Sequence, residues 1–83
     1  MAVVRLPAIL AREAGGRTAF ETAAPTLRAA LGELPVADLV FDTRGELRPL
    51  VNVFVDGEDA RAQLDAPLAD GAEVRVVAAV AGG

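Results

Sequence analysis

Glu73-Val74-Arg75-Val76-Val77 leads directly into the last six residues of the chain, Ala78-Ala79-Val80-Ala81-Gly82-Gly83. The first run is rich in β-branched residues and places charged and apolar side chains in alternation, which predicts a half-buried strand. The six residues that follow carry no charged side chain and nothing larger than valine. Glycine has no Cβ, so a Gly-Gly end can enter a channel too narrow for side chains. The sequence therefore predicts a strand that continues into a thin tail.

The reactive group of such a tail is the α-carboxylate of Gly83. It is ionised near neutral pH and accepts hydrogen bonds, but it becomes an acyl donor only when another molecule activates it. Residues 79–83 would reach roughly 17 Å when extended, at about 3.4 Å per residue. The alternative is an ordinary chain end, because termini are commonly rich in small residues.

Composition excludes most forms of self-sufficient catalysis. The chain has 83 residues, enough for one small domain, and it contains no cysteine and no histidine. All eight basic residues are arginine. The sequence thus offers no thiolate, imidazole base or Schiff-base lysine, and we predict no catalytic residue, no metal site and no bound cofactor.

Charge and hydropathy restrict the partners and the compartment. The formal net charge is -4, which argues against a general nucleic-acid binder. Arg5 and Pro7 interrupt the first apolar residues before a signal-peptide core can form. No stretch approaches the roughly 20 apolar residues of a membrane span. We therefore expect a cytoplasmic protein with no membrane or nucleic-acid partner.

The first half of the chain predicts a hairpin followed by a helix. Residues 3–6 and 17–22 read as strands, separated by residues 8–14, which form either a loop or a helical turn. The main helix is predicted over residues 26–34, with Thr26 as a possible cap. Its apolar stripe consists of Leu27, Ala30, Leu31 and Leu34.

The second half predicts two more strands around less regular segments. Residues 35–49 give no clear pattern, although Leu39-Val40-Phe41 could form a short helical turn or an extra strand. Residues 50–55 are the most strand-like run of the chain, and Asp56-Gly57 predicts a turn after it. Residues 58–66 are predicted to be an irregular arm at the edge of the sheet.

This order of elements predicts an α+β fold of the β-grasp (ubiquitin-like) type. One main helix would pack on a mixed sheet of four to five strands, with the first and last strands parallel at its centre. The domain would comprise residues 1–78, and residues 79–83 would form a flexible tail. Leu27, Leu31 and Leu34 should be buried against Val4, Val53 and Val76.

Strand alternation also predicts an exposed face opposite the helix. Its members, and our candidate partner interface, are Asn52, Phe54, Arg75, Val77 and Arg5. Phe54 is the most informative of them, because a large aromatic side chain on an open face is typical of a binding anchor. The alternative is that the arm of residues 58–66 covers it.

The chain resembles the ubiquitin-like sulfur-carrier family, which includes ThiS and MoaD. The resemblance covers essentially the whole chain and is carried by three stretches. They are Val51-Asn52-Val53-Phe54-Val55-Asp56-Gly57-Glu58-Asp59, Leu68-Ala69-Asp70-Gly71-Ala72-Glu73-Val74 and Val80-Ala81-Gly82-Gly83. Within the family it is strongest to the CysO-type carriers of a cysteine pathway. Two departures are a shorter segment 35–49 and Ala79 at a position where proline is common.

The resemblance implies a role for the tail. In this family an E1-like enzyme uses ATP to adenylate the terminal carboxylate, and sulfur then replaces AMP to give a thiocarboxylate. Gly83 and Gly82 would be the sulfur-carrying end, and Ala79, Val80 and Ala81 would thread into the partner. A second enzyme accepts the sulfur, and the CysO likeness points to a PLP-dependent sulfhydrylase that makes cysteine.

Other functions remain open at the level of sequence. The chain could be the small subunit of molybdopterin synthase, or a carrier for thiamine thiazole, tRNA or secondary-metabolite thiolation. It could also be a ubiquitin-like modifier joined through Gly83 to lysines of other proteins, or a plain interaction module. The receiving chemistry resides in the partner, so these residues do not separate the alternatives.

Overall fold

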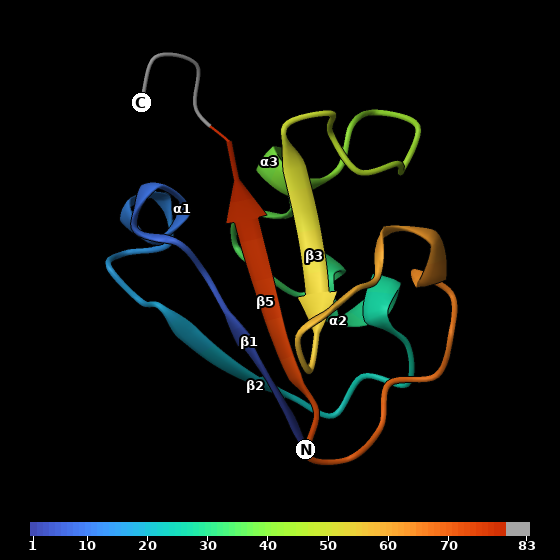
Figure 1. Cartoon of the computed structure of the whole chain (residues 1–83). Helices are drawn as coiled ribbons and strands as arrows, with labels where there is room; N and C mark the ends of the chain where they lie inside the picture. Colours follow the sequence, from blue (N-terminus) through green and yellow to red (C-terminus); the bar gives the residue numbers. More distant parts are fainter. Residues whose placement is uncertain (80–83) are drawn as a thin grey trace.

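Five strands form one mixed sheet in the order β2-β1-β5-β3-β4 (Figure 1). They are β1 (Ala2–Arg5), β2 (Ala19–Thr22), β3 (Val51–Val55), β4 (Glu58–Asp59) and β5 (Glu73–Ala78). The computed structural model describes residues 1–79. β1 and β5 are parallel, and the other neighbouring pairs are antiparallel. The predicted β-grasp arrangement, with the first and last strands side by side, is confirmed.

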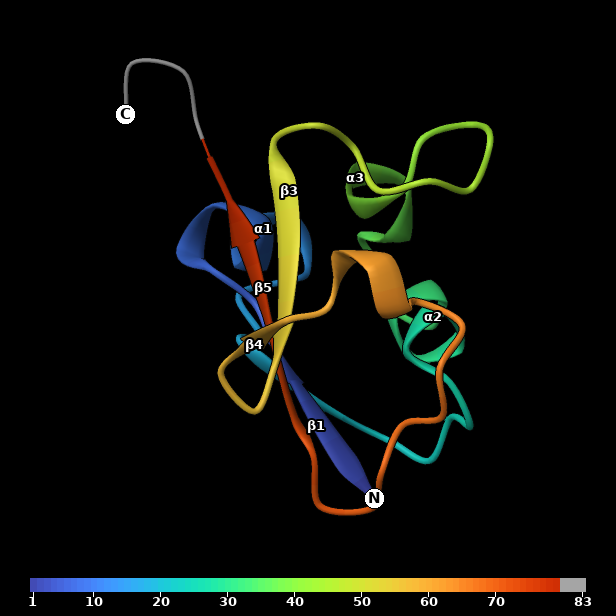
Figure 2. The same cartoon turned by 45° about the vertical axis from the view of Figure 1, so that its right-hand side comes forward.

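The helices are short, and α2 and α3 lie on one face of the sheet (Figures 1 and 2). They are α1 (Ala8–Glu13), α2 (Leu27–Gly32), α3 (Ala37–Val40) and the 3₁₀ turn η1 (Arg61–Gln63). Residues 8–14 thus take the helical alternative. The run Leu39-Val40-Phe41 ends a helix, and Phe41 then pairs with Leu47 in an isolated β-bridge. Within residues 1–79, no helix combines the length and the apolar character needed to cross a membrane.

α2 begins where the sequence predicts it and ends earlier. The Thr26 hydroxyl accepts a hydrogen bond from the Ala29 amide at 3.1 Å, which caps the first turn. After Gly32 the backbone tightens, because the amides of Glu33 and Leu34 bond to carbonyls three residues back. The predicted range 26–34 was therefore too long, although Leu34 remains buried.

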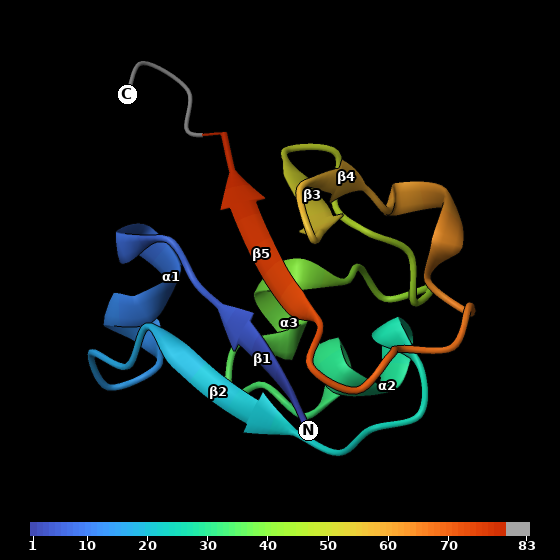
Figure 3. The ribbon, with the colours of Figure 1, turned by 60° about the horizontal axis from the view of Figure 1, so that its bottom comes forward.

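The core lies between the sheet and the helices. Leu27, Leu31 and Leu34 belong to one buried cluster with the sheet residues Val4, Val53 and Val76, as predicted. α1 and α3 contribute to the same cluster through Leu10, Ala11 and Val40. Because all these apolar side chains lie on one side of the sheet, the opposite face is left without a helical cover (Figure 3).

Residues 58–66 are more regular than the sequence predicted. Asp56 and Gly57 both have positive φ, at 50° and 87°, which is the requirement of a tight hairpin turn. The turn brings Glu58 and Asp59 back against β3, where they form the edge strand β4. The chain then passes to the helical side, where Ala60 and Leu64 enter the core. The expectation of an irregular arm was wrong for its first two residues.

Candidate functional site

The open face of the sheet brings the predicted interface residues together. In the register of the strands, Arg5 on β1 lies opposite Arg75 on β5, and Arg75 lies opposite Phe54 on β3. Asn52 and Val77 form the next pair on the same face. Arg5, Arg75 and Val77 are exposed, whereas Asn52 and Phe54 are half-buried. Strand alternation therefore predicted the composition of this face, and its role in binding remains a prediction.

Glu73 organises the charge on this face. The Arg5 Nε donates to Glu73 Oε2 at 2.8 Å, and the Arg75 guanidinium lies 3.6 Å from Glu73 Oε1. The hydrogen bond from Arg5 is the main cause that lowers the pKa of the Glu73 carboxyl, with a smaller contribution from Arg75. Two arginines thus share one carboxylate, which leaves a net positive strip. The sequence analysis missed Glu73, although alternation places it on the same face as Arg75.

Phe54 differs from the other two phenylalanines. Phe20 and Phe41 pack against the buried cluster, whereas Phe54 is not among the side chains that do so in the described chain. Its cross-strand neighbours are Arg75 and Asp59. Two apolar residues of the arm, Ala60 and Leu64, belong to the core cluster instead. Phe54 is thus half-buried on the open face, between Arg75 on β5 and Asp59 at the start of the arm, and is not part of the core cluster.

Asn52 connects β3 to the edge of the sheet. Its Nδ2 donates to Asp59 Oδ2 at 2.9 Å, and Asp59 Oδ1 accepts from the Arg61 amide at 3.0 Å. The hydrogen bond from Asn52 is the largest cause that lowers the pKa of Asp59. Asn52 thus fixes the first residues after the turn, which is a structural function whatever its contribution to binding.

The root of the tail is anchored at the end of β5. The Ala79 amide donates to the Leu50 carbonyl at 2.8 Å, directly after the last pair of the β3–β5 ladder. Ala79 is exposed. This end of β5 lies near α1 and α3 (Figure 1). The other predicted tail residues, Val80, Ala81, Gly82 and Gly83, are outside the described residues.

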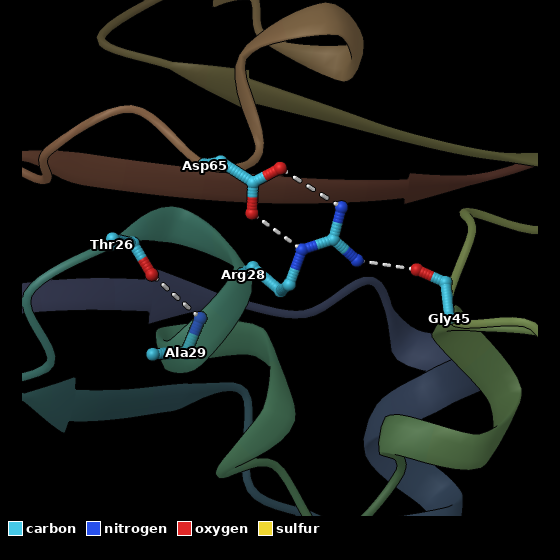
Figure 4. A network of polar contacts seen from close by, with 5 residues as sticks. All are labelled: Thr26, Arg28, Ala29, Gly45 and Asp65. Carbon is cyan, nitrogen blue, oxygen red and sulfur yellow. Dashed lines mark hydrogen bonds and ion pairs between the residues drawn. The ribbon is translucent and has the colours of Figure 1, made fainter.

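A second polar cluster surrounds Arg28 on α2 (Figure 4). Its Nε donates to Asp65 Oδ1 at 2.7 Å, and its Nη1 donates to the Gly45 carbonyl. These bonds join α2 to the turn before β3 and to the segment after η1. The hydrogen bond from Arg28 lowers the pKa of Asp65. The arrangement therefore joins three segments of the chain around one guanidinium.

No group of three or more acidic side chains within residues 1–79 could hold a metal ion. On the open face Arg5 and Arg75 both contact the Glu73 carboxylate, and the apolar side chains of Phe54 and Val77 lie beside Arg75 and Asn52 in the strand register. The arrangement can therefore bind a protein surface beside the tail root. It does not place reactive groups around a small substrate.

Comparison with known proteins identifies the family. The ThiS family model matches residues 4–83, so the chain belongs to the ThiS family. A sulfur carrier protein of Mycobacterium tuberculosis, CysO, is 33% identical over 96% of both chains. The structure of an Amycolatopsis orientalis BexX/CysO complex contains a chain with a TM-score of 0.81 and 27% identity, with full coverage of both chains. SAMP1 from Haloferax volcanii has a TM-score of 0.76 and 34% identity, covering 99% of this chain and 98% of that one.

Proposed function

We propose that the protein is a sulfur carrier whose active group is the α-carboxylate of Gly83. The observation that carries this proposal is the ThiS match, which extends through Gly82 and Gly83 and covers the whole domain after residue 3. The similarity to CysO proteins that are named as sulfur carriers supports the same assignment. The fold supplies a rigid strand, β5, that delivers the chain to Ala79 one residue past the sheet.

The chemistry of the proposed cycle begins with activation. The Gly83 carboxylate oxygen attacks the α-phosphorus of ATP on an E1-like enzyme, and pyrophosphate leaves. A sulfide sulfur then attacks the acyl carbon and AMP leaves, which gives the thiocarboxylate directly. A persulfide donor would instead give an acyl disulfide, from which a thiol releases the thiocarboxylate as the donor and that thiol form a disulfide. The domain itself contributes binding and delivery, and the enzymes supply the reactive side chains, because the chain has no cysteine, histidine or lysine.

We further propose that the sulfur is used to make cysteine. The relatives named CysO support this choice over a pterin, thiazole or tRNA acceptor. The thiocarboxylate sulfur would attack the aminoacrylate formed from O-phosphoserine on a PLP-dependent sulfhydrylase, with phosphate already released. An S-to-N acyl shift would leave cysteine on Gly83 through a peptide bond, and a peptidase would then hydrolyse that bond.

The activation step is tested by ATP–pyrophosphate exchange. The full-length chain and the E1-like enzyme of the same organism should exchange labelled pyrophosphate into ATP. A variant that lacks Gly82 and Gly83 is the matched control, and it should fold normally and give no exchange. Equal exchange by the shortened chain would show that Gly83 is not the activated group. The cysteine assignment is tested separately. The thiocarboxylated chain is incubated with the sulfhydrylase and O-phosphoserine, and the mass of the intact protein is then measured.

A second candidate is a protein modifier, and one specific observation favours it. SAMP1 of Haloferax volcanii, whose name is small archaeal modifier protein 1, is 32–34% identical to this chain in two structures. The same activated Gly83 would then acylate a lysine amine of a target protein. Sulfur transfer and conjugation are distinguished by the product, which is a modified small molecule in the first case and a Gly-Gly isopeptide on a target in the second.

A further inference from the structure

An apolar groove of about 590 Å³ lies beside the end of β5, on the helical side of the sheet. It is formed by α1, α3 and the segment that leads into β3. Ile9, Leu39 and Leu50 contribute to it from these three places, with 42%, 38% and 58% of their surfaces exposed. They are three of the five large apolar side chains that are exposed in residues 1–79.

The clustering of these three exposed apolar side chains differs from ordinary surface exposure. Single exposed apolar side chains are common on small domains and require no explanation. A contiguous group is typical of an interaction site, because covering it removes a large apolar area from water, which is favourable. Here the group is assembled from three separate elements, so one helix with an unusual composition does not account for it.

The groove is continuous with the root of the tail. Ala78 and Ala79 line it, and the Ala79 amide is bonded to the carbonyl of Leu50. Gly83 is four residues beyond Ala79, so the two lie at most about 14 Å apart along an extended chain. An enzyme that encloses Gly83 therefore comes close to Ala79, and this groove and the nearest part of the open face are the surfaces that it meets there.

We propose that the groove binds an apolar segment of the adenylating enzyme while the tail occupies its ATP site. This inference rests on the proposed function. Arg48 and Glu13 border the groove. The Arg48 guanidinium bonds to the Asp38 carbonyl at 2.8 and 3.1 Å, so its position is fixed and its charge is not neutralised by that contact. The segment should accordingly present leucine-, isoleucine- or phenylalanine-like side chains, with an acidic group toward Arg48.

A second copy of the chain is the less suitable occupant. A copy seated in the groove would cover Ala79, and the same contact on its partner would cover the other tail root. A stable dimer of this kind would keep the activating enzyme from both tails, in conflict with the proposed function. The adenylating enzyme has no such conflict, because its binding site for Gly83 brings it to the groove in any case.

The test uses Leu50→Glu in the full-length chain, with ATP–pyrophosphate exchange by the E1-like enzyme of the same organism. A charge in the groove should raise KM for the carrier by about tenfold or more and change kcat by less than about twofold, since it removes binding common to the ground and transition states. Leu50→Met keeps the groove apolar and should therefore raise KM much less than Leu50→Glu does. Ala69→Glu adds the same charge at an exposed site near the other end of β5 and should leave KM unchanged.

Circular dichroism melting confirms that each variant is folded before KM is compared. An unchanged KM for folded Leu50→Glu would overturn the groove assignment while wild-type exchange would still support the carrier. Absence of exchange by the wild-type chain would instead remove the proposed function and this inference with it. A concentration-dependent dimer that Leu50→Glu abolishes without affecting KM would assign the groove to a second copy. Ile9 and Leu50 methyl resonances that shift when residues 80–83 are deleted, again with unchanged KM, would assign it to the chain's own tail.

Discussion

Leu31→Ala tests the core on which the whole assignment of the fold depends. Leu31 is fully buried on α2 and packs in the cluster that includes Val4, Val53 and Val76. The substitution removes three carbon groups, at about 0.8 kcal/mol each for transfer from water, or about 2.4 kcal/mol. The residual cavity adds to this, because leucine-to-alanine changes in rigid cores cost about 3–5 kcal/mol. We expect a loss of about 3 kcal/mol.

That loss is large for a domain of this size. At about 0.05–0.15 kcal/mol per residue, the 83 residues give a total stability of roughly 4–12 kcal/mol. A loss of 3 kcal/mol should lower the melting temperature by about 12–24 °C, from about 4–8 °C per kcal/mol. The chain has no tryptophan and no tyrosine, so urea unfolding is best followed by far-ultraviolet circular dichroism.

Leu50→Ala is the matched control for this measurement. It makes the same chemical change at a side chain that is 58% exposed, and it should cost less than about 0.5 kcal/mol. Equal losses at the two positions, or a loss below about 1 kcal/mol at Leu31, would show that the α2 face is not the core.

Three further changes test local parts of the structure. Thr26→Ala removes the cap of α2 and should cost about 1 kcal/mol, measured by urea unfolding; an unchanged stability would contradict the capping role. Asp65→Asn should be less stable than the wild type above the ordinary carboxyl pKa, because Arg28 lowers the pKa of Asp65 in the folded state. That difference should diminish as pH falls through the lowered folded-state pKa, whereas a difference independent of pH would refute the ion pair as its cause. Phe54→Ala should weaken binding to the adenylating enzyme by about 2 kcal/mol, or about 30-fold, and destabilise the fold by less. A loss of folding stability with intact binding would instead make Phe54 a structural residue.

The long-range architecture could be predicted because local patterns agreed with one another. The alternation in residues 50–55 and 73–77 placed valines on one face, and the leucine spacing after Thr26 supplied the layer that covers them. These patterns determined the sheet face, the helix face and hence the core. The interface candidates followed from the same alternation, since every second residue of β3 and β5 must point away from the helices.

The irregular segments could not be predicted in the same way. β4 consists of two residues, Glu58 and Asp59, whose sequence has no strand propensity. They pair with β3 because the turn at Asp56 and Gly57 returns the chain to its edge, and Asn52 then holds Asp59. The four-residue helix α3 is likewise fixed by burial of Val40 rather than by a periodic pattern. The groove escaped prediction because it joins side chains from three elements that are distant in sequence.

Mass spectrometry of the intact chain tests the sulfur-carrier account most directly. The full-length protein is incubated with ATP, magnesium, its E1-like enzyme and a persulfide or sulfide source, and the product is fragmented to locate the change. The account predicts replacement of one oxygen by sulfur at the Gly83 carboxyl, dependent on ATP and absent from a chain that lacks Gly82 and Gly83. An unmodified Gly83 under conditions in which the enzyme is active on another carrier, or sulfur located elsewhere in the chain, would contradict it.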